Sequence, residues 1–139
     1  MDFEFVGGFG PIASDMEATH AFWAGALGVP FHYDNPGYFH NFDVPGTKCF
    51  ALWSLAQAAE ATFGTPEWPA EWPAPRAWIE FELASPEAVS RAAEELREAG
   101  QELLHDAHQD PWGQTTARLL SPEGLLVGLS YFPKFHDVA

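Results

Sequence analysis

The same order of predicted elements occurs twice along this chain, and that repetition constrains the fold more than any other feature. The first copy opens with a strand at 3–13 and a helix that starts at the capping box Ser14-Asp15-Met16-Glu17 and stops at Gly28. The helix carries an apolar stripe that we expect to face a sheet, formed by Met16, Thr19, Phe22, Trp23, Ala26 and Leu27. Three short strands follow at 30–33, 38–44 and 48–55, separated by turns at Asn35-Pro36-Gly37 and Pro45-Gly46.

The second copy repeats this β-α-β-β-β order. A strand at 77–83 leads to a helix that Ser85 caps, with Pro86 in its first turn, and that ends at Gly100. Strands follow at 101–105, 114–120 and 125–132, and the Pro-Gly turn after the first copy's third strand has its counterpart at Pro122-Glu123-Gly124. An internal duplication accounts for this pattern. It predicts an α+β fold in which residues 1–56 and 77–139 are the two units and residues 57–76 connect them.

The connector contains four prolines within Thr65 to Pro75, which exclude a regular helix there, although a short helix is compatible with 56–61. It also carries Trp68 and Trp72. Aromatic residues are enriched both at interfaces and in pockets. Two interpretations of these tryptophans therefore stay open: they cover exposed edges of the core, or they form a lid or a dimer contact.

The charge of the chain excludes some partners. A formal net charge of −14 has the wrong sign for binding the phosphate backbone of nucleic acid, whereas it attracts cationic small molecules. The single cysteine, Cys49, cannot form an internal disulfide, and the N-terminus lacks the basic and apolar regions of a signal peptide. No apolar run approaches the roughly 18 residues of a membrane span. We therefore expect a cytoplasmic protein without a membrane or nucleic-acid partner.

Strand alternation at 77–83 identifies candidate site residues. If Ile79 and its same-face neighbours pack beneath the second helix, then Trp78, Glu80 and Glu82 face the other side of the sheet. Two carboxylates beside an indole suit a cationic ligand. Because burying either one without a partner is costly, we expect a wet pocket, a basic neighbour such as Arg76 or Arg118, or a cationic ligand. The alternative is that Glu82 lies in solvent at the strand end and Glu80 pairs with an arginine across the sheet.

Two βαβββ units in a chain of this length resemble the vicinal oxygen chelate superfamily, which includes glyoxalases, extradiol dioxygenases and bleomycin-resistance proteins. The resemblance covers essentially the whole chain, and its most specific motifs are Asp110-Pro111-Trp112-Gly113-Gln114 and 121–129. It implies that the curved mixed sheets form a half-open barrel around a cavity, with the helices on the outer side.

Catalytic members of that superfamily bind a divalent metal through His, Gln or Glu side chains. The corresponding positions here fall on Gly8, Trp78, Gly128 and one of Ala51, Trp53 or Ser54. Because these side chains are poor metal ligands, we predict no metal site and no cofactor. His105 and His108 could share a metal only through a turn between them, which we consider the less favoured alternative.

The resemblance and the surplus of aromatic residues together predict a metal-independent protein that binds, and thereby sequesters, a cationic or aromatic antibiotic or natural product. The expected ligand-binding residues are Trp78, Glu80, Glu82, Trp53, Trp112, Tyr38, His40, Phe42, Gly8 and Gly128. Relatives that sequester drugs often place the pocket between two chains, so a homodimer is expected. Two alternatives remain: a divergent lyase, isomerase or dioxygenase that uses a relocated metal or a carboxylate base, and a partner-binding module with a vestigial cavity.

Overall fold

The computed structural model describes residues 1–34 and 38–136, so the predicted Asn35-Pro36-Gly37 turn and the last three residues of the second unit lie outside the described residues. Eight strands form one open mixed sheet, which confirms the predicted α+β class. The strands are β1 (Phe5–Ala13), β2 (His32–Asp34), β3 (Tyr38–Asn41), β4 (Cys49–Ser54), β5 (Ala77–Glu82), β6 (His105–Gln109), β7 (Thr115–Leu120) and β8 (Leu126–Tyr131).

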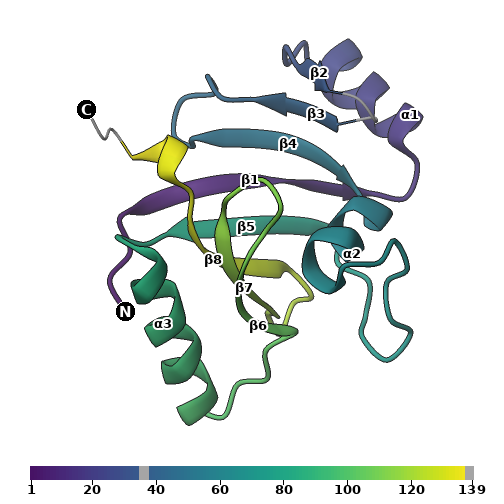
Figure 1. The fold of residues 1–139 in the computed structure, drawn as a ribbon. Coiled ribbons are helices and arrows are strands. Elements are labelled where there is room, and N and C mark those ends of the chain that lie inside the picture. The colour runs from purple at the N-terminus through teal and green to yellow at the C-terminus, as the bar shows by residue number, and fades with distance from the viewer. Residues whose placement is uncertain (35–37, 137–139) are drawn as a thin grey trace.

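The order of the strands follows the same topology in the two halves of the sheet. It runs β2-β3-β4-β1-β5-β8-β7-β6, so each unit contributes the same arrangement to one half of the sheet (Figure 1). The first strand of each unit pairs in parallel with the last, and β1 and β5 join the two halves in antiparallel register, with Gly8 opposite Glu80. The centre of the sheet is therefore built from both units.

The helical segments are α1 (Met16–His20), η1 (Ala21–Ala26), α2 (Leu55–Phe63), α3 (Pro86–Glu98) and η2 (Pro133–Phe135). The Ser85 hydroxyl caps α3 by accepting from the backbone N–H of Ala88, with Pro86 in the first turn, as predicted. Ser54 caps α2 in a full capping box with Gln57, and Gly64 ends α2 in the left-handed region. The short connector helix expected at 56–61 is thus present and longer.

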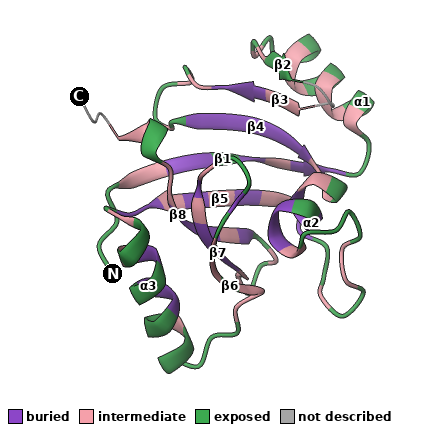
Figure 2. Cartoon of the chain, in the orientation of Figure 1, coloured by how far each residue is buried: buried purple, intermediate pink, exposed green. Residues whose placement is uncertain are grey.

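Two clusters of buried apolar residues hold the molecule together. One lies between α3 and the second half of the sheet and includes Leu83, Val89 and Ala93. The other joins α2 to the opposite, concave side of the sheet and includes Trp53 and Trp78. Figure 2 shows a buried stripe along α3 and none along α1. The second helix therefore packs as a sheet-covering helix should, whereas the first packs much more loosely.

The first helix differs from its prediction in two ways. Its cap is Asp15 rather than Ser14, because the Asp15 carboxylate accepts from the backbone N–H of Ala18. After His20 the helix widens into the π-helical segment η1, which adds residues to the turn and rotates the apolar stripe. As a result Phe22 and Leu27, expected to face the sheet, are 53% and 58% exposed.

Strand limits also moved. The strand predicted at 101–105 is wrong: β6 begins at His105, because the chain needs the residues after Gly100 to return from the end of α3 to the sheet edge. The strand predicted at 30–33 begins instead at His32. The remaining predicted strands are present with ends shifted by a few residues, which is where sequence patterns are least informative.

Candidate functional site

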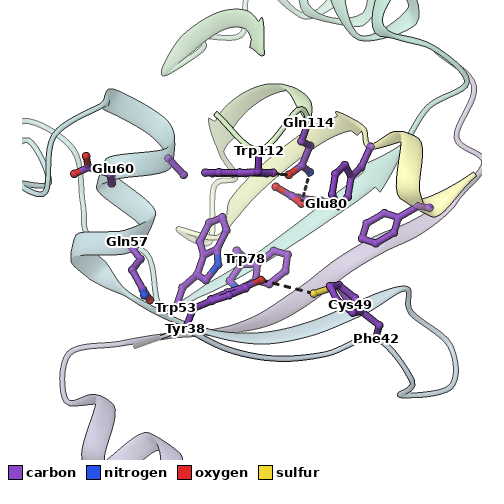
Figure 3. A pocket seen from close by; sticks show the side chains of 13 residues that line it. Tyr38, Phe42, Cys49, Trp53, Gln57, Glu60, Trp78, Glu80, Trp112 and Gln114 are labelled. Carbon is purple, nitrogen blue, oxygen red and sulfur yellow. Dashed lines mark hydrogen bonds between the residues drawn. The ribbon is translucent and has the colours of Figure 1, made fainter. Parts of the chain in front are cut away.

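A cavity of about 440 Å³ lies on the concave side of the sheet, bordered by α2 and by the turn between β6 and β7 (Figure 3). Its size suits a small organic molecule. Most of its lining is aromatic or apolar, contributed by Tyr38, Phe42, Cys49, Trp53, Ala61, Trp78, Trp112, Phe132 and Phe135. The polar lining residues are Gln57, Glu60, Glu80 and Gln114.

Trp78 forms the floor of the cavity and rests on two glycines of β1. A Cβ atom at Gly8 would lie 2.5 Å from the Trp78 ring, and one at Gly10 would lie 3.0 Å from its Nε1. The indole of Trp53 stacks with that of Trp78, with centroids 4.8 Å apart and planes inclined by 18°. Only glycine lets a strand backbone approach an indole this closely. The Gly-Gly-Phe-Gly segment of β1 therefore allows the Trp78 indole to pack against the strand.

The wall contributed by the first unit is apolar and uncharged. The Tyr38 hydroxyl lies 3.9 Å from the Cys49 sulfur, close enough for a weak hydrogen bond. Burial raises the pKa of Tyr38 above its usual range and raises the pKa of the Cys49 thiol to about 12. Both groups are therefore neutral at physiological pH, and Cys49 is a poor nucleophile.

The second unit contributes a buried polar network that begins at Glu80. One Glu80 oxygen accepts from Gln114 Nε2 at 3.0 Å, and the other accepts from the guanidinium of Arg118 at 3.3 Å. This confirms the alternative in which Glu80 pairs with an arginine across the sheet. Arg118 also stacks over Trp53, with the guanidinium carbon 5.8 Å from the ring centroid.

The network continues from Arg118 to Asp110, which is 3% exposed. The Asp110 Oδ2 atom accepts from Arg118 at 3.3 Å and from the Thr116 hydroxyl at 3.1 Å, while Arg118 also donates to the backbone carbonyl of Ala61 in α2. His108 Nε2 lies 2.8 Å from the other Asp110 oxygen. One buried guanidinium thus bridges two buried carboxylates and ties the sheet to α2, so its removal would take their shared cationic partner from both.

The pKa of Glu80 is raised, mainly because burial disfavours the carboxylate, and Asp110 adds to this effect. Arg118 and the hydrogen bond from Gln114 act in the opposite direction. Glu80 is thereby the titratable side chain that connects the cavity to the buried network.

Trp112 closes the cavity on the side opposite Tyr38 and Trp53 (Figure 3). It sits in the β6–β7 turn, is 48% exposed, and donates from Nε1 to Gln114 Oε1 at 2.7 Å. Gly113 adopts a left-handed conformation with φ 93°, which lets this turn close between Asp110 and Gln114. Gln114 therefore fixes both the exposed indole and the buried carboxylate of Glu80.

No family model matches the chain, and no curated protein matches it. Solved structures do match it. A structure described as a glyoxalase/bleomycin resistance protein/dioxygenase superfamily member from Vibrio splendidus 12B01 has a TM-score of 0.56 at 13% identity, over 94% of this chain and 100% of that chain. A variant of Streptomyces coelicolor methylmalonyl-CoA epimerase has a TM-score of 0.54 at 16% identity, over 95% of this chain and 96% of that one.

The chain has the fold of the vicinal oxygen chelate superfamily. A further match, described as an NAD-dependent benzaldehyde dehydrogenase from Legionella pneumophila, has a TM-score of 0.59 at 10% identity, over 90% of this chain and 97% of that one. The three descriptions name different activities, so the likeness establishes the fold and leaves the function to the residues of the site.

The positions that hold a metal in catalytic members of the vicinal oxygen chelate superfamily do not fit one here. Gly8 lies under the Trp78 ring, and a Cβ atom at Gly128 would lie 2.8 Å from Cγ of Glu80. Side chains of the chain itself thus fill the space beside both glycines. Within residues 1–34 and 38–136, no group of three or more His, Cys, Asp or Glu side chains is placed to hold a metal ion. The donor set therefore does not fit the superfamily's metal.

Of the ten residues predicted to bind ligand, six line the cavity: Tyr38, Phe42, Trp53, Trp78, Glu80 and Trp112. Gly8 and Gly128 support the floor from below. His40 is buried beside Tyr38 and Phe42, but its Nε2 atom lies 2.5 Å from Asp34 and it is not part of the lining. Whether any of these residues contacts a ligand stays a prediction.

Glu82 is fully buried, which makes the solvent-exposed alternative wrong. It lies outside the cavity lining, beneath the C-terminal residues. His105 and His108 stack on each other with centroids 3.9 Å apart, and they too lie outside the lining. Burial, followed by Arg118 and His108, lowers the pKa of His105 to about 3. An enzyme with a relocated metal would need some of these groups to meet in the cavity. Of His40, Glu80 and the His105/His108 pair, only Glu80 is among the lining residues.

Sequence reasoning missed the roles of Gln114, Asp110 and the α2 residues Gln57 and Glu60. The first two belong to the Asp-Pro-Trp-Gly-Gln motif, so a polar residue on each side of an aromatic turn was the available signal. The α2 residues carried no such signal, because only the tertiary structure brings the connector helix to the cavity. No helix among the described residues is long and apolar enough to cross a membrane.

Proposed function

We propose that this chain is a metal-independent binding protein for a planar aromatic small molecule that carries a cationic group, held without chemical change. The observation that carries the proposal is the cavity itself, in which Trp53 of β4, Trp78 of β5 and Trp112 of the β6–β7 turn line a space of about 440 Å³. Flat aromatic side chains favour flat ligands, which can stack on them. The interaction becomes stronger when the ligand is cationic, because a cation is attracted to the face of an aromatic ring.

Charge supports a cationic ligand. The described lining includes the carboxyl groups of Glu60 and Glu80 and no lysine or arginine side chain. Glu80 is balanced by Arg118, so the exposed Glu60 at the rim and the net charge of −14 supply most of the attraction. Sequestration of an antibiotic or related natural product, expected from the sequence, is the use that such a cavity would serve.

The test is a fluorescence titration with proflavine, a planar tricyclic cation, because three of the chain's six tryptophans line the cavity. We expect quenching on binding, in EDTA as well as without it. The matched probes are 9-anthracenecarboxylate, planar but anionic, and tetraethylammonium, cationic but not aromatic. We expect weaker binding of the first and none of the second.

Trp112→Ala is the informative variant, because the side chain is half exposed and its loss disturbs the core least. We expect proflavine affinity to fall at least about tenfold, or about 1.4 kcal/mol. Trp23→Ala, on the outer face against Phe50, is the control and should leave affinity unchanged. If the two variants changed proflavine affinity equally, Trp112 would not be part of the binding site. Trp78→Ala is less clean, because Trp78 is also part of the core.

A second candidate, an enzyme with a carboxylate base, is favoured by one observation: Glu80 is a buried carboxyl group of raised pKa on the floor of an aromatic cavity. Both of its oxygens already accept hydrogen bonds, which is why we rank binding first. Mass spectrometry of any natural-product ligand recovered after incubation separates the two candidates. Unchanged mass and stereochemistry support binding, whereas a changed product supports catalysis.

The homodimer and the cytoplasmic location remain proposals. The candidate dimer contact is partly used within the chain, since Trp68 Nε1 donates to the Trp72 carbonyl and the Trp68 ring packs edge-on against Phe63. This favours the interpretation in which Trp68 covers the edge of the core. Light scattering of wild type and Trp72→Ala tests whether the connector joins two chains; a dimer that persists in the variant would exclude Trp72 from the contact.

A further inference from the structure

Residues Phe132–His136, which we call the C-terminal strap, follow β8 and cross from the second unit to the first. In Figure 1 the strap runs from β8 past β1 and ends near β4. Phe132 and Phe135 line the cavity, so the strap forms part of its wall. The residues that close this end of the cavity thus come from a short segment that follows β8.

The strap contacts the first unit through Lys134, Phe135 and His136. Lys134 Nζ lies 4.1 Å from the centroid of the Phe42 ring, and Phe135 meets the same ring edge-on with centroids 6.3 Å apart. His136 Nδ1 lies 3.6 Å from Glu4 Oε1, and the His136 ring lies 5.6 Å from the Phe5 ring, centroid to centroid.

Glu82 supplies the buried attachment of the strap. Its Oε2 atom accepts from the backbone N–H of Phe132 at 2.5 Å and lies 2.9 Å from His136 Nε2. These two contacts attach Phe132 and His136, the first and last residues of the strap, to the same carboxylate. His136 also packs against Tyr131, with ring centroids 4.5 Å apart. The Glu82 side chain is fully buried, and its Oε1 atom has no hydrogen-bond partner among the described residues.

We propose that the C-terminal strap is the lid of the cavity and that the contact of Glu82 with Phe132 and His136 is its latch. A buried carboxylate is costly unless it is paired, and its paired oxygen is satisfied only by the strap. Closing the strap and satisfying Glu82 are therefore one event. The lid's role in ligand exchange rests on the proposed function, whereas the latch does not.

The latch is tested in the intact chain by hydrogen exchange of individual backbone amides. His136→Ala removes one half of the latch, together with the contacts of His136 to Glu4 and Phe5, and leaves the buried Glu82 in place. We expect exchange of the Phe132, Phe135 and His136-position amides to rise by about tenfold or more, with the amides of α3 unchanged. His136→Gln, which can still donate to Glu82, should restore protection. His20→Ala, on the outer helix, is the control.

Three results would overturn the latch: unchanged exchange in His136→Ala, an equal rise in α3, or no recovery in His136→Gln. The lid is tested separately by the dissociation rate of proflavine in stopped-flow fluorescence. We expect about tenfold faster dissociation from His136→Ala than from wild type or His136→Gln. An unchanged rate with an opened strap would overturn the lid, whereas failure of wild type to bind proflavine would overturn the proposed function and leave the latch standing on its exchange data.

Discussion

The two halves of the sheet share one topology but present different side chains to the cavity on the concave side. The first half presents Tyr38, Phe42, Cys49 and Trp53 to the cavity, a surface without a charge. The second half presents Glu80, backed by the Arg118–Asp110 network. One unit thus supplies apolar surface and the other supplies fixed polarity. A duplicated fold can divide a binding site in this way, because topology places side chains without determining their chemistry.

The outer faces differ as well. Helix α3 buries Val89, Ala92 and Ala93 against the second half, whereas α1 and η1 have no buried residue. Phe50 beneath them is covered by Trp23 and Phe31, but Phe9 on β1 is 45% exposed. The second unit is therefore the better-packed half. Substitutions there should lower the free energy of unfolding more than substitutions at matching places in the first unit.

The largest effect is expected at Arg118. Arg118→Met leaves Glu80 and Asp110 buried without their shared partner, which should lower the free energy of unfolding by about 3–5 kcal/mol. Urea unfolding followed by circular dichroism measures it. Arg91→Met, on α3 and exposed, is the control and should change stability by less than about 0.5 kcal/mol. A similar small change at Arg118 would mean that the network does not hold the second half together.

The packing difference is tested by a pair of leucines. Leu83→Ala, at a site 1% exposed beneath α3, should cost about 2–5 kcal/mol. Leu27→Ala, at a site 58% exposed after η1, should cost less than about 0.5 kcal/mol. Chemical denaturation of both variants gives the comparison. Equal losses would show that the first helix packs as tightly as the second.

The polar network should show itself in the pH dependence of stability. Because the pKa of Glu80 is raised in the folded state, its favourable contribution is complete below the ordinary Glu range and is lost as pH rises through the raised pKa. Glu80→Gln cannot ionise. The stability of Glu80→Gln relative to wild type should therefore improve as the pH rises above the ordinary Glu range of about 4, as measured by urea unfolding. A difference that does not vary with pH would contradict the raised pKa.

The smallest predicted effect is an increase in stability. Gly25 lies in η1 on the loosely packed side, and a Cβ atom there would meet nothing within 4 Å. Gly25→Ala should therefore raise the midpoint of thermal unfolding, with a gain of about 0.5–1 kcal/mol. Gly10→Ala is the contrast, since its Cβ atom would lie 2.0 Å from the Ala51 carbonyl oxygen and should destabilise the sheet. Destabilisation by Gly25→Ala would show that η1 does not tolerate a better helix former.

The sequence predicted the class, the strand order within each unit and the cap of α3, because alternation, helical stripes and capping residues are local signals. It also placed Trp78, Glu80 and Glu82 on the concave side, since strand parity follows from spacing alone. The π-helical widening at Ala21–Ala26 was beyond it, because the hydrogen-bond pattern of a helix is not encoded in the apolar spacing.

The site was predicted less completely. The aromatic lining followed from strand positions, but the partners of Glu80 depend on side chains that approach across three strands and a turn. Gln114 and Arg118 lie more than thirty positions from Glu80, so no local pattern joins them. The burial of Glu82 is set by the C-terminal strap, whose path over the sheet has no signature in composition or spacing.

The most direct test of metal-independent binding is a thermal-shift experiment on the purified protein, with EDTA, single divalent metals, proflavine and bleomycin-type glycopeptides in separate wells. A ligand at one hundred times its Kd adds about 2.7 kcal/mol and shifts the midpoint by several degrees. We predict a rise with the planar cation that EDTA leaves unchanged, and no rise with the metals. Stabilisation by a divalent metal, or destabilisation by EDTA, would contradict the account and point to a metal-dependent reaction.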